Sequence, residues 1–137
     1  MRLGAWLKFP AALWWGSLTT IGFLVVPLLF MHLPTPALAG GMAAKLFTAQ
    51  TWVSVACGGI LLLISTSKQA SAPAQRAHDA IIFILLGLLL ALLVEFAVAP
   101  RIVTRTNLKL WHSVGSVMYL VQWLCAAIVF WRITPKQ

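Results

Sequence analysis

Acidic residues are nearly missing from this chain, and charge of either sign is sparse. Only two of its 137 residues are Asp or Glu, and charged residues make up 9% of the total. An average soluble domain carries about a quarter charged residues, so the composition excludes a domain of that kind. Hydrophobic residues account for 61% and gather in long apolar runs, which indicates an integral membrane protein.

Cysteine and catalytic motifs are also scarce. Cys57 and Cys125 both lie inside apolar runs and show no CxxC spacing, which argues against a disulfide framework or a zinc site. No set of nucleophile, base and orienting residue can be assembled, and no phosphate-binding loop or dinucleotide fingerprint occurs. The sequence therefore favours a protein that is not an enzyme, and it predicts no cofactor firmly.

The positive charge has the placement of membrane anchors. The formal net charge is +8, yet the ten Lys and Arg residues stand singly beside apolar segments rather than in one stripe. Such residues bind anionic lipid head groups at the membrane surface. The predicted partner is the lipid bilayer and not a nucleic acid.

The apolar runs predict an all-α membrane protein, an up-down bundle of four transmembrane helices in a single domain, 1–137. Each run is about 20 residues long, the length needed to cross roughly 30 Å of hydrocarbon. The predicted spans are 11–32, 47–64, 80–99 and 110–131, with a flexible connection over 65–78. The second helix is expected to begin earlier, near Ala37, outside the bilayer.

Both termini then lie on one side of the membrane. That side, with the connection between the second and third spans, carries six Lys or Arg residues against four on the other side. The excess favours cytoplasmic termini.

Glu95 is the one acid inside a predicted span. By helical rise it lies about 7 Å from the end of that span. A carboxylate inside a bilayer costs about 2.5 kcal/mol or more at mid-depth, so it must be paired, hydrated or protonated. The hairpin topology places Glu95 toward the same, external face as His32 and His112. Our leading hypothesis is a site for a cation, metal, proton or small ligand formed by Glu95, Arg101, His112, Ser116 and Tyr119.

Three alternatives stay open. Glu95 could form a structural ion pair with Arg101 or Lys45. His32 and His112, with Met31, could hold haem b or copper between the first and fourth spans, although two interfacial histidines without a ligand are the simpler interpretation.

The third alternative is a structural or assembly subunit, packed as a homo-oligomer or against a membrane-protein partner. Small residues allow membrane helices to approach closely. Here they recur at helical spacing in two predicted packing faces, formed by Ala12, Gly16 and Thr20 and by Ser54 and Gly58.

Several short segments, in this order, resemble one family. They are Leu13-Trp14-Trp15-Gly16-Ser17, Val26-Pro27-Leu28-Leu29-Phe30, Ala39-Gly40 with Leu46-Phe47, Glu95 with Ala99-Pro100-Arg101, and Leu110-Trp111-His112-Ser113-Val114-Gly115-Ser116 with Tyr119. Over nearly the whole chain the sequence resembles the bacterial transmembrane-protein-205-like domain of unknown function. The resemblance implies a compact four-span protein of the bacterial inner membrane. Its animal relatives are linked to platinum-drug resistance, which implies metal or drug handling.

A more distant similarity concerns the segment around Pro27 and Phe30. It is similar to copper-resistance-D-like membrane proteins and to the haem-linked protoporphyrinogen oxidase of the same general shape. That oxidase needs a histidine early in its first span, and the corresponding stretch here, 8–12, contains none.

Overall fold

The computed structural model describes residues 6–66 and 72–134, and the side chains of these residues except 72–74. The regular elements of this part are all helices. The first span is built from α2 (Lys8–Thr20), η1 (Ile21–Val25) and α3 (Val26–His32), and the second is α4 (Pro36–Ser65). The short α5 (Ala72–Asp79) precedes the third span, which is built from α6 (Ile81–Leu93), η2 (Val94–Val98) and α7 (Ala99–Val103). The fourth span is α8 (Leu108–Ile133).

All four spans are long and apolar enough to cross a membrane. The shortest, Ile81–Val103, has 23 residues and therefore a length of about 35 Å at the usual helical rise. The predicted fold class, a bundle of four transmembrane helices, is confirmed.

The helix boundaries differ most from the predicted ones in two places. The third span continues through Pro100 to Val103, although we placed its end at Ala99. The predicted flexible connection over 65–78 contains the helix α5, while residues 67–71 lie outside the described part. The second helix begins at Pro36, where the Thr35 side chain caps it by accepting a hydrogen bond from the Leu38 N–H at 3.3 Å.

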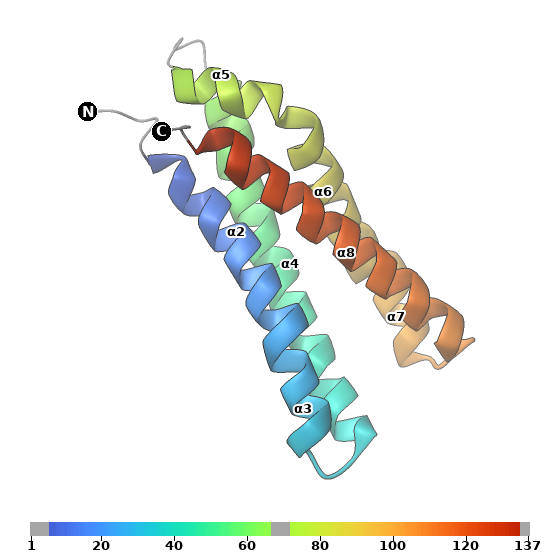
Figure 1. The fold of residues 1–137 in the computed structure, drawn as a ribbon. Coiled ribbons are helices and arrows are strands. Elements are labelled where there is room, and N and C mark those ends of the chain that lie inside the picture. Colours follow the sequence, from blue (N-terminus) through green and yellow to red (C-terminus); the bar gives the residue numbers. More distant parts are fainter. Residues whose placement is uncertain (1–5, 67–71, 135–137) are drawn as a thin grey trace.

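The spans form a closed ring in chain order. Each packs against its neighbours in the sequence, and α2 packs against α8 (Figure 1). Fully buried side chains fill the centre, among them Leu7, Trp14, Leu18, Leu61, Ile84 and Val129. Gly87 lets α6 approach Trp14, since a Cβ at position 87 would lie 2.8 Å from the indole.

Two spans contain a π-helical turn, and both turns stand in the same relation to a proline. Pro27 lies two residues after η1, and Pro100 lies two residues after η2. A proline has no N–H, so neither can bond to the carbonyl four residues earlier, which belongs to Phe23 or Phe96 inside the π-helical turn. The widened turn accommodates that loss within a continuous helix.

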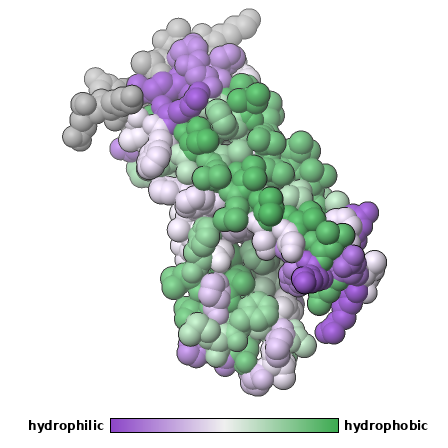
Figure 2. Space-filling model, turned by 45° about the vertical axis from the view of Figure 1, so that its right-hand side comes forward, coloured by the Kyte–Doolittle hydropathy of each residue, from purple (hydrophilic) through white to green (hydrophobic). Residues whose placement is uncertain are grey.

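Beyond the π-helical turns the two hairpins separate. We call the end of the bundle that contains α3 and α7 the tip end. There α3 packs against α4 and α7 packs against α8, and Figure 1 shows these two helix pairs diverging. We call the opposite end, where α5 crosses the bundle, the α5 end. Figure 2 shows a broad hydrophobic surface between hydrophilic ends, as expected for lipid-facing helices.

Candidate functional site

Glu95 belongs to η2 and bonds to the neighbouring span α4. The Thr48 hydroxyl donates to both carboxylate oxygens of Glu95, at 2.9 Å to Oε1 and 3.2 Å to Oε2. Because the third span extends to Val103, Glu95 precedes its end by eight residues, 95 to 103, or about 12 Å of helical rise. The carboxylate is half-buried, and it lies farther from the end of its span than the 7 Å that we predicted.

Arg101 does not supply the counter-ion that we predicted for Glu95. Its Nη1 donates to the Ala97 carbonyl oxygen at 2.7 Å, and its guanidinium lies 4.5 Å from the centre of the Trp111 ring. The Arg101 side chain is exposed, whereas the Glu95 carboxylate faces Thr48 of α4. The long side chain instead extends over an aromatic ring near the tip end, as arginines at span ends do.

Tyr119 faces the first span rather than Glu95. Its hydroxyl donates to the Leu18 carbonyl oxygen at 2.7 Å, and its ring lies against Gly22 of η1, where a Cβ would come within 2.5 Å. The ring also meets that of Phe47 edge to face, with 5.3 Å between centres. Tyr119 thus joins α8 to α2, η1 and α4.

His112 and Ser116, the other two members of the predicted cluster, are exposed. The Ser116 hydroxyl donates to the His112 carbonyl oxygen at 2.8 Å, a bond within one helix. The predicted cluster of five residues is therefore not assembled, because its members on α8 lie on both the inner and outer sides of that helix.

The predicted haem or copper residues do not converge either. His32 and His112 are exposed, and Met31 is 73% exposed. α3 packs against α4 and η1, whereas α8 packs against α2, α5, α6, α7 and η2. Within residues 6–66 and 72–134, no group of three His, Cys, Asp or Glu side chains could hold a metal.

Of the two predicted packing faces, the one on α4 is buried and the one on α2 is largely exposed. Ser54 and Gly58 are buried, and a Cβ at Gly58 would lie 2.6 Å from Leu88 of α6. Ala12 and Thr20 are exposed, and nothing lies within 4 Å of a Cβ built at Gly16. The face of α2 that enters this bundle instead carries Ala11, Trp14 and Leu18, so the prediction that the Ala12 face meets the bundle interior is wrong for this chain.

A buried amide network, which the sequence analysis missed, occupies the bundle interior. The Gln50 Nε2 donates to Ser17 at 2.9 Å and to Ser54 at 3.4 Å, and the Gln122 Nε2 donates to Ser54 at 3.0 Å. Gln50 is 2% exposed, Gln122 3% and Ser54 0%. These bonds join α2, α4 and α8 in the middle of the membrane-spanning region.

The hydrogen-bond donors of this network leave one acceptor, the Gln50 Oε1, without a partner among the described residues. The Ser17 hydroxyl donates to the Trp14 carbonyl oxygen and the Ser54 hydroxyl donates to the Gln50 carbonyl oxygen. Both serine oxygens must therefore accept from the amide nitrogens, which fixes the orientation of the Gln50 amide. Its buried Oε1 then has no partner in the described residues. Buried polar atoms in proteins are nearly always bonded, so this oxygen calls for a water or another donor.

α4 connects the polar side chains of all four spans. Thr48 bonds to the third span, Gln50 to the first and Ser54 to the fourth. The sequence signal for these residues is weak but real, since polar residues recur at 48, 50, 51 and 54 in an otherwise apolar run.

These features define a four-span membrane protein with polar groups inside its bundle. Residues 9–110 match the family described as Domain of unknown function (DUF4149), and the chain belongs to that family. No curated protein and no solved structure matches the chain. The predicted membership of a domain family of unknown function is confirmed, whereas no finding supports the distant similarity to copper-resistance-D-like proteins or protoporphyrinogen oxidase.

Proposed function

We propose that this protein binds a proton or a small monovalent cation at Glu95 and passes it across the membrane. The observation that carries the proposal is the bond from Thr48 to both oxygens of Glu95, within a span and without a basic partner among the described residues. This arrangement holds the acid in place but leaves its charge uncompensated.

The energetics favour uptake of a positive charge. A carboxylate at the centre of a bilayer costs about 2.5 kcal/mol or more, and a hydrogen bond to a charged group returns about 1.5–3 kcal/mol. One hydroxyl can therefore offset much of the cost, but it does not change the charge. A bound proton or cation removes the charge itself.

The basic residues on the elements around Glu95 are turned outward. η2 packs against α4, α6, α7 and α8. The basic or titratable groups of these elements toward the tip end are Lys45, Arg101, Lys109 and His112, and all four are exposed. Arg101 also has its own partners in Ala97 and Trp111. A mobile ion is thus the partner that the site supports best.

The unfilled Gln50 acceptor supports the same proposal. It lies in the bundle interior on α4, two residues after Thr48 and on a different side of that helix. A water bonded to Gln50 would bring a mobile hydrogen-bonding group into the interior beside α4, and proton transfer within membranes uses such groups.

The chain contains a matched control for the test, because Asp79 is its only other acid. The protein is reconstituted into vesicles with a pH-sensitive dye, on which a pH jump is imposed, and into vesicles with a dye sensitive to Na⁺ or K⁺, on which a gradient of that cation is imposed. We expect the wild type and Asp79→Asn to carry protons or one of the cations into the vesicles, and Glu95→Gln to lose that flux. Equal flux in Glu95→Gln and the wild type would overturn the proposal.

We also propose a bacterial inner-membrane location with cytoplasmic termini. The support is the six-to-four excess of basic residues on the terminal side. Reporter fusions test it: a C-terminal phosphatase fusion, active only outside the cytoplasm, should be inactive, and an active fusion would reverse the orientation.

A further inference from the structure

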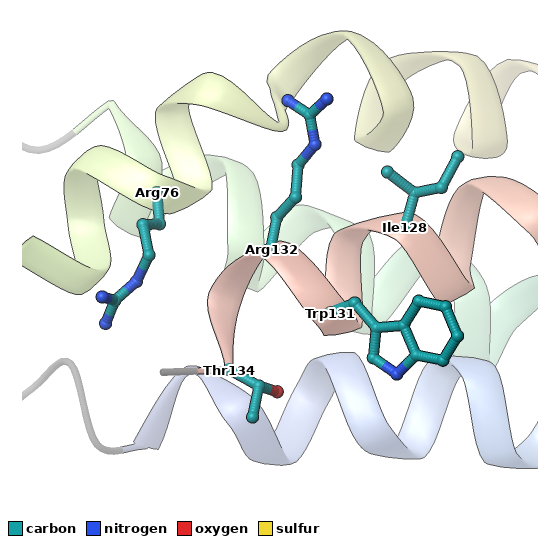
Figure 3. A pocket seen from close by; sticks show the side chains of 5 residues that line it. All are labelled: Arg76, Ile128, Trp131, Arg132 and Thr134. Atoms are coloured by element: carbon teal, nitrogen blue, oxygen red, sulfur yellow. The ribbon is translucent and has the colours of Figure 1, made fainter. Parts of the chain in front are cut away.

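A basic pocket lies at the α5 end of the bundle. It is lined by Arg76, Ile128, Trp131, Arg132 and Thr134 and has a volume of about 600 Å³. Figure 3 shows Arg76 on α5, with the other four residues on α8 or directly after it. We call it the Arg76–Arg132 pocket. Since its two arginines come from different helices, it exists only while α5 packs on α8.

Both arginines retain hydrogen-bonding capacity. The Arg76 Nε is buried and has no hydrogen-bond partner among the residues that the structure describes. The Arg132 Nη1 donates to the Asp79 carbonyl oxygen at 3.1 Å, and its guanidinium lies 5.0 Å from the centre of the Phe83 ring. That bond uses one of the five N–H donors of an arginine and holds the guanidinium in place.

The charge of the pocket suits a singly charged anion. Asp79 lines an adjoining smaller pocket together with Arg76 and Arg132, and its Oδ1 accepts a bond from Gln75 at 3.0 Å. The two guanidinium groups and the carboxylate leave one net positive charge, and because Figure 3 shows the two guanidinium groups pointing in different directions, a bound anion meets one of them directly and the other acts at longer range. A phosphodiester carries one negative charge and presents the oxygens that arginine binds best.

The apolar part of the pocket points to a lipid rather than to free phosphate. Ile128 and Trp131 line the same pocket on the outer surface of α8, and Trp131 is 70% exposed. A tryptophan at a span end lies at the level of the lipid head groups, and basic pockets between membrane helices bind anionic lipids. We propose that the Arg76–Arg132 pocket binds the phosphodiester head group of an anionic membrane lipid, whose acyl chains lie along Ile128 and Trp131. The bound lipid bridges α5 to α8.

Thermal unfolding in detergent tests this proposal. Delipidated protein is titrated with phosphatidylglycerol, phosphatidylcholine or inorganic phosphate, and the unfolding temperature is recorded. We expect phosphatidylglycerol alone to raise it. Arg76→Gln and Arg132→Gln should each weaken the apparent affinity about fivefold, because an arginine near anionic lipid contributes about that factor. Lys109→Gln and Arg105→Gln, at the tip end, are matched controls and should leave it unchanged.

Other outcomes overturn the proposal. An equal rise with phosphatidylcholine would indicate binding by acyl chains alone, and an equal rise with inorganic phosphate would indicate a free-anion site. Arg76→Gln removes no hydrogen bond within the described residues, so it remains informative if Arg132→Gln fails to fold. Native mass spectrometry of the Arg76→Gln protein then counts retained phosphatidylglycerol. Undiminished retention contradicts the proposal, and the result does not depend on Glu95.

Discussion

The Thr48 hydroxyl donates to both oxygens of Glu95 and thereby joins α4 to the π-helical turn η2. This bond has two consequences. It sets the position of the one acid in the spans, and it makes α4 the helix through which every other span makes a polar contact.

The first prediction concerns this bond. Thr48→Val keeps the shape of the side chain and removes its donor, so the free energy of unfolding should fall by about 1.5–3 kcal/mol, the value of a hydrogen bond to a charged group. In a Glu95→Gln background the fall should shrink to about 0.5–1.5 kcal/mol, because the bond is then between neutral groups. Unfolding in mixed micelles measures both values as a double-mutant cycle.

Thr51→Val is the control for that cycle. Thr51 lies on the same helix, but its hydroxyl donates to the Phe47 carbonyl oxygen of α4 itself, at 3.1 Å. It should show no coupling to Glu95. If Thr48→Val, like Thr51→Val, shows no coupling to Glu95→Gln, the result would contradict the bond.

A second prediction concerns the amide network. Gln122→Met preserves the size of the side chain and removes the bond to Ser54. We expect a loss of about 0.6–1.7 kcal/mol, between the average and the maximum for hydrogen bonds between membrane helices. Gln75→Met, at an exposed position on α5, should change stability little. Stability equal to that of the wild type in Gln122→Met would show that the network does not hold the helices together.

A third prediction concerns Gly22. Its π-helical turn lies against Tyr119, and an added Cβ would meet the Tyr119 ring at 2.5 Å. Gly22→Ala should therefore displace the ring, break its bond to Leu18 and cost about 1–3 kcal/mol, as overpacking does. Gly16→Ala has open space and should be neutral or stabilising. The two unfolding curves can be compared directly, and similar costs would argue against the close approach at Gly22.

The number and order of the spans could be predicted from the sequence because the bilayer thickness imposes the length of an apolar run. The end of the third span could not be predicted, since a proline such as Pro100 normally ends a helix. Here the turn before it widens into η2 and the helix continues. That extra length is why Glu95 lies farther from the end of its span than predicted.

The polar contacts inside the bundle were predicted in part. Glu95 was identified by its charge, but its partner Thr48 was not, because a single threonine in an apolar run usually bonds to its own helix. Gln50 and Gln122 were missed for a similar reason: an uncharged amide has little effect on the hydropathy of a span. The position of Arg101 could not be predicted either, because the direction of its side chain depends on packing. The sequence placed it near Glu95, and the structure places it over Trp111.

The most direct test of the account is infrared spectroscopy of the reconstituted protein at one fixed pH, recorded before and after addition of Na⁺ or K⁺ and after exchange into D₂O. The spectrum of Glu95→Gln is subtracted from that of the wild type under each condition, and Asp79→Asn is treated in the same way. We predict a carboxyl band, missing from Glu95→Gln and kept in Asp79→Asn, that shifts with one of the cations if Glu95 binds a cation and with D₂O if Glu95 holds a proton. A Glu95 band that responds to neither cation and not to D₂O would contradict the central claim.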